Sequence, residues 1–372
     1  KLSNATSPGP QEITIATKTG PSYIYAVANI NNGSTYQLVG DNTRELLNVT
    51  DVERSGLKRE DFLKIKFKRT PVTGNQVPKP SPDDNIFMMS GYINDGNQVT
   101  IKKSEQEKGY IDGASTNQPD NLNTIKIHRI LAKNKFEIDL NNSTGFTPKS
   151  FRLYNIPKQG MLIRNAPYIS DANDGYYDYS ESIDKGEFTF YCPENKKGNV
   201  DGITTWEVRE ENSYYQTDDN SNQIYTGVKE FTKAPVNSTY VEIQGDYYNS
   251  TTTTTNSTTT KTETSGNVSY SIHLGDFSST GSLGDYNVVR NYYYQYKVIV
   301  NGVDDIIAEA VVVGDTDNDD NPYAEGLVIR TTANGHYEVD AHYEARVMKF
   351  TKTAIQSLKA ANNNAGMGYI LN

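Results

Sequence analysis

Apolar and polar residues alternate with a period of two along several stretches of the chain. In residues 337–347 the odd positions are apolar or aromatic, and the even positions carry charged or imidazole side chains. Successive side chains of a β-strand point to opposite faces, so this stretch predicts a strand with one buried and one solvated face. Residues 292–300 repeat the pattern, with five residues on one face: Tyr292, Tyr294, Tyr296, Val298 and Val300.

Shorter stretches show the same alternation. Val241 and Ile243 are expected to point one way while Tyr240 and Glu242 point the other, and residues 135–140 alternate similarly. Antiparallel sheets with one wet face give this pattern, whereas buried parallel sheets give continuous apolar runs. The sequence therefore predicts an all-β fold built from antiparallel sheets, packed as a sandwich.

Two Asn-Gly pairs mark turns between strands. Asn301-Gly302 follows 292–300 and precedes an apolar run at 306–313, and Asn334-Gly335 precedes 337–347. Asn-Gly between two apolar runs is the strongest short-range signal of a β-hairpin. We therefore expect two hairpins in the last third of the chain.

The length of 372 residues exceeds the usual size of one hydrophobic core. A break is expected within 157–185, because residues 170–182 are rich in Asp, Gly, Tyr and Ser and show no periodicity. A new set of strands is expected to open at 187–191. These signals predict two domains, 1–165 and 166–372.

Residues 249–266 form a low-complexity stretch of Thr, Ser and Asn between two predicted strands. Such a stretch buries too little apolar surface to pack in a core. We favour a long hairpin tip that projects from the fold. A ligand-binding loop is the alternative.

Composition and charge narrow the function. The chain has 27 Tyr and a net charge of −10, and its densest basic run, residues 64–69, alternates along one strand face. Nucleic-acid binding needs clustered Lys and Arg, so no nucleic-acid partner is expected. No stretch approaches the roughly 20 apolar residues that a membrane-spanning helix needs.

Cys192 is the single cysteine of the chain, so no intrachain disulfide can form. Its setting between Tyr191 and Pro193 favours a small buried residue of a strand. A catalytic nucleophile is the alternative, but no His or Lys lies nearby in the sequence to lower the pKa of the thiol.

Recognisable catalytic and metal-binding motifs are missing. The four His residues show no metal-ligand spacing, and no nucleophile elbow or phosphate-binding loop occurs. The acidic run 315–321 alternates oxygen ligands as a calcium loop does. It lacks a glycine at the sixth position, and Gly326 replaces the bidentate acid at the twelfth. We therefore expect a solvated loop there, and no enzyme activity, cofactor or metal.

One run in the second half resembles a family signature. Residues 286–304 contain Arg290-Asn291 followed by Tyr294, Tyr296, Val298, Val300 and Asn301-Gly302-Val303-Asp304. This run resembles the RNxxYxYxVxVNGVD signature of fimbrillin-like proteins, the type V pilus subunits and related adhesins of Bacteroidetes. Further segments resemble the same family in the same order, at 87–91, 130–133, 190–198, 239–245 and 340–347.

The resemblance implies two tandem transthyretin-like Greek-key β-sandwich domains. It also implies export to the outer membrane as a lipoprotein precursor. An Arg-directed protease then removes an N-terminal strand, and the C-terminal strand of another subunit fills the groove. The chain begins at Lys1 without Met, so we expect that processing or truncation has removed an export segment.

The tail 351–372 is the expected donor of that strand, because it ends in an apolar stretch after a flexible Asn-rich joint. The candidate donor residues are Met367, Tyr369, Ile370 and Leu371. An ordinary final strand of its own domain, or the cut end of a longer chain, is the alternative.

The function predicted on these grounds is a structural subunit of a cell-surface fimbria. Its partners would be copies of itself and related pilus subunits, joined by strand addition, and a host or bacterial surface ligand. The alternative is a tip or stand-alone adhesin that binds glycan or protein through exposed Tyr side chains and residues 249–266.

Overall fold

Strands make up almost all regular structure in the computed structural model of the chain. The structure describes residues 18–28, 36–39, 45–46, 58–69, 87–103, 109–114, 122, 124–143, 145–164, 175–217, 223–255, 258–302 and 306–313. All of these except Lys18 belong to one compact unit, Thr19–Asp315. The predicted all-β class is confirmed.

Several predicted features lie outside the described residues. They are the strand at 337–347, the turn at Asn334-Gly335, the acidic run 315–321, and the tail 351–372 with Met367, Tyr369, Ile370 and Leu371.

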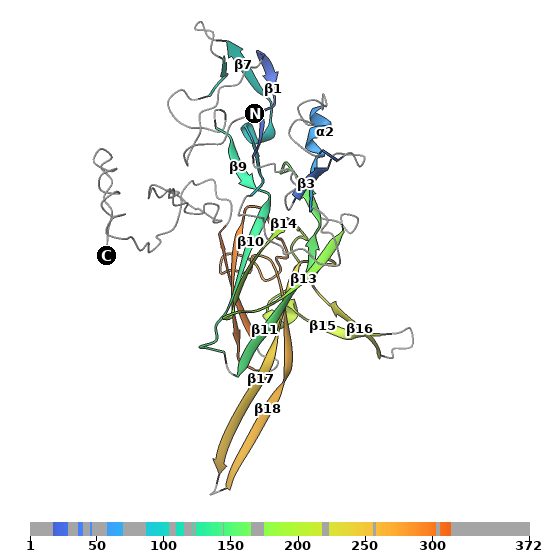
Figure 1. Cartoon of the computed structure of the whole chain (residues 1–372), viewed down its shortest axis with the longest axis vertical. Helices are drawn as coiled ribbons and strands as arrows, with labels where there is room; N and C mark the ends of the chain where they lie inside the picture. Colours follow the sequence, from blue (N-terminus) through green and yellow to red (C-terminus); the bar gives the residue numbers. More distant parts are fainter. Residues whose placement is uncertain are drawn as a thin grey trace, which may run out of the picture. The chain divides into compact units, whose positions relative to one another are not determined.

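Two four-stranded sheets face each other in the part of the described chain from residue 131 onward (Figure 1). The first sheet contains, in order, β14 (Glu187–Pro193), β10 (Leu131–Ile138), β19 (Tyr293–Val300) and β20 (Ile306–Val313). The second contains β13 (Tyr176–Ser182), β11 (Phe146–Pro157), β17 (Tyr240–Thr255) and β18 (Thr258–His273).

One apolar cluster fills the space between these sheets. The ring of Phe151 in the second sheet stacks on Phe188 in the first at 3.9 Å between centroids, and Phe136 stacks on Tyr296 at 4.6 Å. Alternating apolar residues of each strand point into this cluster, as the period of two predicts. We call this pair of sheets the sandwich.

Most strand pairs in the sandwich are antiparallel, as expected, but β10 and β19 run parallel from Lys133↔Tyr293 to Ile138↔Val298. Parallel neighbours need a long crossover connection. Residues 139–292 supply it here, which a local alternation pattern cannot reveal.

The turn at Asn301-Gly302 behaves as predicted. β19 and β20 pair antiparallel from Val300↔Ile306 to Tyr293↔Val313. The hairpin therefore joins the two apolar runs that flank this pair.

Three smaller sheets come from the first part of the chain. Their strands are β1 (Gly20–Ser22), β7 (Val99–Lys103) and β8 (Gly109–Ile111); β2 (Tyr25–Ala28), β6 (Met89–Tyr92) and β9 (Lys126–Arg129); and β12 (Gln159–Met161), β5 (Lys66–Arg69), β3 (Tyr36–Val39) and β4 (Glu45–Leu46). The helix α2 (Arg59–Leu63) and the 3-10 turn η3 (Asn94–Gly96) connect them. A second apolar cluster, which includes Phe67 and Leu162, draws its residues from α2 and from the last two of these sheets and the segments beside them.

The chain enters the sandwich much earlier than the predicted boundary at 165/166. β9 leads through the buried Ile130 directly into β10, and β11 follows. β10 and β11 are central strands of the two sheets, so 131–157 contributes to the same core as residues after 176. The chain then returns to β5 through β12. The division into two domains stays a prediction, with the chain crossing between them at Ile130.

Three elements were not expected from the sequence. β13 lies in the stretch 170–182 that we predicted to be irregular, and pairs with β11. The hairpin of β15 (Asn212–Thr217) and β16 (Gln223–Phe231) and the short helix α3 (Trp206–Arg209) precede β17.

Candidate assembly interface

β20 is the outermost described strand of its sheet. Among the strands that the structure describes, its single neighbour is β19. Its sequence, Ile-Ile-Ala-Glu-Ala-Val-Val-Val, is apolar on the face of Ala308, Ala310 and Val312 and carries one exposed charge, Glu309, on the other face. Ala310 points into the core and is 7 % exposed, whereas Val311 on the opposite face is 58 % exposed. An apolar strand with one unpaired edge is a template for another strand.

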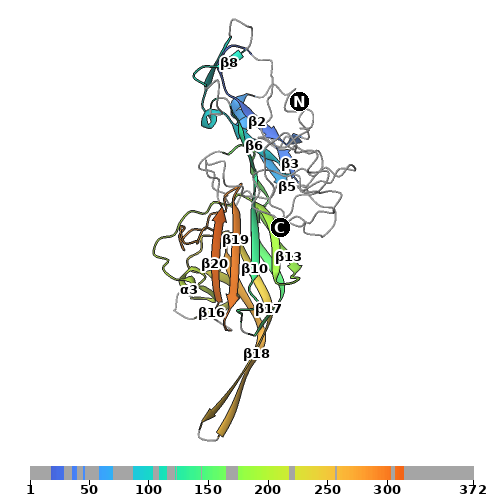
Figure 2. The same cartoon turned by 90° about the vertical axis from the view of Figure 1, so that its left-hand side faces the viewer.

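β18 is the outermost described strand of the other sheet, on the same side of the sandwich (Figure 2). The Tyr270 hydroxyl of β18 donates a hydrogen bond to the carbonyl oxygen of Gly302, in the turn before β20, at 2.8 Å. Two edges, β18 and β20, therefore lie beside each other. Among the described strands, each sheet therefore has one edge without a neighbour on this side of the sandwich.

The tyrosines of the signature-like run belong to the core. Tyr294 and Tyr296 are each 1 % exposed, and Val298 and Val300 are buried beside them. The Tyr294 hydroxyl accepts a hydrogen bond from the Val289 amide at 2.9 Å, and the Tyr296 hydroxyl donates to the carbonyl oxygen of Gly275 at 3.2 Å. Burial raises the pKa of both phenols well above the ordinary value. These residues hold the fold and offer no surface to a ligand.

Arg290 and Asn291 join the sandwich to the first part of the chain. The buried Arg290 guanidinium donates to the carbonyl oxygen of Leu162 at 3.2 Å. It also lies 3.8 Å from a carboxylate oxygen of the buried Glu194. The Asn291 side-chain oxygen accepts from the Arg129 amide at 2.9 Å. The Arg-Asn pair of the signature therefore fixes the crossing of the chain near residue 130.

Cys192 lies in β14 and is fully buried, as the preferred interpretation predicts. Burial raises the pKa of its thiol to about 12, although the Asn134 amide donates a hydrogen bond to the sulfur at 3.4 Å. A thiol that stays protonated and buried is not a nucleophile.

The low-complexity stretch forms part of a long hairpin, as predicted. β17 pairs with β11 only as far as Tyr247↔Phe146, but its pairing with β18 continues to Thr255↔Thr258 (Figure 1). We call residues 248–255 and 258–265 the arm. The described arm side chains are exposed, so the stretch projects beyond the sheets.

The β15–β16 hairpin covers part of the outer face of the second sheet. The Lys229 ammonium bonds to Glu242 and to Ser271 at 2.8 and 2.9 Å. Phe231 packs edge-on against Tyr240 at 5.0 Å. These contacts explain why Tyr240 and Glu242 are buried, although they lie on the face opposite Val241 and Ile243.

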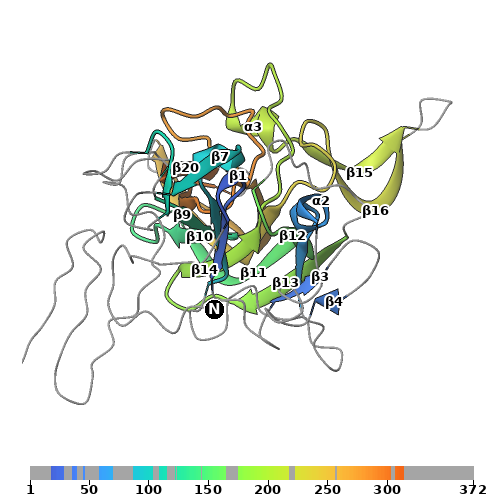
Figure 3. The same cartoon turned by 90° about the horizontal axis from the view of Figure 1, so that it is seen from above.

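The other end of this hairpin points away from the sandwich (Figure 3). It carries several exposed apolar side chains, among them Tyr225, which is 64 % exposed. The Tyr214 and Tyr225 rings lie 6.3 Å apart. Exposed aromatic rings of this kind are available to a protein or sugar partner.

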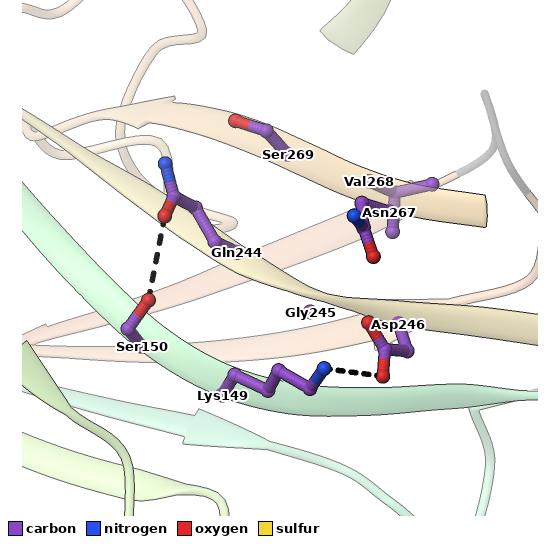
Figure 4. Close-up of a pocket in the computed structure, with 8 residues that line it drawn as sticks. All are labelled: Lys149, Ser150, Gln244, Gly245, Asp246, Asn267, Val268 and Ser269. Carbon is purple, nitrogen blue, oxygen red and sulfur yellow. Dashed lines mark hydrogen bonds and ion pairs between the residues drawn. The ribbon is translucent and has the colours of Figure 1, made fainter.

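A shallow polar hollow lies on the same outer face, beside the base of the arm (Figure 4). Its volume is about 360 Å³. Its lining comes from β11, β17 and β18: Lys149, Ser150, Gln244, Gly245, Asp246, Asn267, Val268 and Ser269. Lys149 pairs with Asp246 at 2.5 Å, and Ser150 donates to Gln244 at 3.4 Å. These side chains bond one another across the sheet, which suits a solvated surface more than a catalytic cleft.

Two described His residues have structural partners. The His273 Nδ1 atom lies 2.6 Å from Glu210, and the neighbouring Arg209 donates to the carbonyl oxygens of His273 and Leu274. The His128 Nδ1 atom lies 3.0 Å from the Asn291 amide nitrogen. No sequence pattern indicates the buried pair of His273 and Glu210, because the two residues are 63 positions apart.

Within the described ranges, no group of three or more His, Cys, Asp and Glu side chains is placed to hold a metal ion. No helix in the same ranges is long and apolar enough to cross a membrane.

The chain is similar to one family model and to several solved structures. A family model described as "Domain of unknown function (DUF4906)" matches residues 190–298. No curated protein matches the chain.

Several solved structures match over most of the chain. The tip fimbrial protein Mfa3 from Porphyromonas gingivalis, with a C-terminal truncation, is 14 % identical with a TM-score of 0.39, over 79 % of this chain and 99 % of that one. A candidate cell adhesion protein from Bacteroides eggerthii is 13 % identical with a TM-score of 0.35, over 77 % and 76 %. Another, from Parabacteroides distasonis, is 10 % identical with a TM-score of 0.39, over 80 % and 76 %.

Proposed function

We propose that this chain is a structural subunit of a bacterial surface fimbria of the type V class, which polymerises by donor-strand exchange and supports adhesion. The observation that carries the proposal is the open edge of β20, an apolar strand that has one neighbour among the described strands. A subunit of this kind needs no catalytic residue, cofactor or metal.

A strand from a second subunit would add beside β20. Its backbone would bond to the open edge, and its inward side chains would pack near Ala308, Ala310 and Val312, on the core face of β20. Only a strand with apolar residues at alternate positions can pair with the edge of β20 and also pack against the core.

The proposed donor is the tail 351–372, through Met367, Tyr369, Ile370 and Leu371. In an extended strand Met367, Tyr369 and Leu371 share one face, which gives three apolar side chains for the core. The partners would be copies of this chain and related pilus subunits at the cell surface, after export as a lipoprotein precursor.

A synthetic peptide of residues 351–372, added to the chain cut after Phe350, tests this assignment. We expect the peptide to raise the melting temperature of the cut chain progressively with its concentration, because a ligand that binds only the folded state stabilises it. A peptide of the same composition in scrambled order is the control. Equal effects of the two peptides, or none, would count against the tail as donor.

A tip or stand-alone adhesin is the second candidate. The exposed Tyr214 and Tyr225 and the polar hollow beside the arm favour it, because aromatic rings and polar side chains together suit glycan or protein ligands. Such a subunit need not lengthen a shaft, so it would stay monomeric with or without the tail.

A further inference from the structure

The arm is a two-stranded ribbon with two open edges among the described strands. The last hydrogen bond that joins β17 to its neighbour on the β11 side is donated by the Tyr248 amide. It is accepted by the carbonyl oxygen of Gly145, the residue just before β11, at 2.8 Å. Beyond it, β17 and β18 pair only with each other as far as Thr255↔Thr258. An isolated two-stranded ribbon is marginally stable in water, so a further strand would stabilise the arm.

The backbone of β18 presents its odd-numbered residues to the open edge. Leu274 donates to the Thr239 carbonyl oxygen on the β17 side, whereas the His273 amide points the other way and donates to Glu210. The pairing of β17 with β18 continues along the arm without a register shift. The outward groups of the arm therefore belong to Thr259, Lys261, Glu263 and Ser265.

Lys261 and Glu263 are the only charged residues of 258–266, and they form an ion pair on one face of β18. Their side chains are 59 % and 49 % exposed. Opposite charges two positions apart are self-complementary when a strand pairs antiparallel with a copy of itself. The register centred on Thr262 places each Lys261 opposite Glu263 of the second copy.

The neighbouring registers are unfavourable. Centring the pair on Lys261 or on Glu263 places two like charges directly opposite each other, which destabilises a sheet. The register centred on Thr262 also sets odd residues opposite odd residues, so the outward backbone groups of the two edges meet.

We propose that the open edge of β18 in the arm pairs antiparallel with the same edge of a second copy of this chain, about a two-fold axis at Thr262. The two arms then form one four-stranded ribbon. Such an interface is isologous, since the same patch serves both copies. The contact is lateral and independent of strand exchange at β20, so either can fail without the other.

Charged residues on an edge strand also serve to prevent pairing, and a solvated arm is the competing outcome. The two accounts differ in the geometry that they predict. Pairing fixes one register, whereas a solvated arm meets other arms only by random collision.

Cysteine cross-linking of the full chain distinguishes them. At the two-fold axis the two Thr262 Cα atoms would lie about 4.5 Å apart, within reach of a disulfide. We expect Thr262→Cys to give a covalent dimer on mild oxidation, seen on non-reducing gels of boiled samples, where strand-exchange polymers dissociate. Cys192 is fully buried and does not compete.

Thr264→Cys is the matched control. Its Cα atom would lie about 13 Å from that of the same residue in the second copy, too far for a disulfide. For the same reason, two copies of the Thr260→Cys variant are not expected to cross-link with each other. A mixture of the Thr260→Cys and Thr264→Cys variants is expected to cross-link, because residues 260 and 264 lie opposite each other in this register. Equal yields at 262 and 264, or no dimer at 262, would overturn the proposal.

Charge reversal gives an independent readout in the Thr262→Cys background. Lys261→Glu alone and Glu263→Lys alone each bring like charges together, so each is expected to lower the dimer yield roughly tenfold. Mixing the two variants restores both ion pairs and should restore the yield. Yields that do not change on charge reversal would contradict the proposed register.

Discussion

Two lysines on the apolar face of the tail, Tyr369→Lys with Leu371→Lys, are expected to abolish polymerisation of the chain. In an extended donor these side chains point into the core of the accepting sandwich. An unpaired ammonium group is too costly to bury there, so the strand would not insert. Sedimentation velocity and electron micrographs of the purified variant measure the loss.

The matched control carries the same two charges on the opposite face, Gly368→Lys with Asn372→Lys. Those positions would face solvent in the inserted strand, so polymers are expected to persist. Equal loss in both variants would show that added charge, rather than burial of one face, prevents assembly. Equal persistence would mean that this tail is not the donor.

Arg290→Met is expected to lower the free energy of unfolding by about 3–5 kcal/mol, because it removes one member of a buried ion pair. Lys196, 3.4 Å from Glu194, stays in place in this variant. Arg290 and Glu194 are each 1 % exposed, and the guanidinium also bonds to the Leu162 carbonyl oxygen. Urea denaturation, monitored through the fluorescence of Trp206, the single Trp of the chain, would measure the change.

Arg152→Met is the control for this prediction. Arg152 lies 3.4 Å from Asp178 with its side chain 48 % exposed. An exposed ion pair contributes at most about 1 kcal/mol, so this variant should unfold nearly as the parent does. A similar small effect for Arg290→Met would contradict the structural role that we give to the signature-like run.

The sandwich strands could be predicted where one face is buried and the other solvated. The face of Tyr294 and Tyr296 followed from the period of two, and the buried setting of Cys192 followed from its neighbours Tyr191 and Pro193. The Asn301-Gly302 turn also behaved as its sequence indicates. In each case the signal is local, so a single sequence is sufficient.

β13 and the β15–β16 hairpin were missed because polar residues and Gly interrupt their apolar positions, so that no period of two stands out. β13 contains Asp178 and Glu181, which lie at an exposed sheet edge, and so it lacks an alternating pattern. The contact that holds β16 in place, between Lys229 and Glu242, joins residues whose proximity no sequence pattern indicates.

The apolar run of β20 predicted a strand, but its place at the edge of a sheet did not follow from the sequence. That place depends on the parallel pairing of β10 with β19, two strands that are more than 150 residues apart. The sequence also does not indicate that β10 and β11, before residue 165, share a core with strands after residue 176, since composition marks loops and not the sheet to which a strand belongs. The donor residues lie outside the described ranges, so their role stays a proposal.

Strand exchange through the tail is tested most directly by comparing the chain with and without residues 351–372. Electron microscopy and denaturing gels of unheated and boiled samples are the measurements. We predict filaments and a heat-sensitive ladder for the full chain, and neither after the cut. A chain that is monomeric in both forms would contradict the account and favour a tip or stand-alone adhesin.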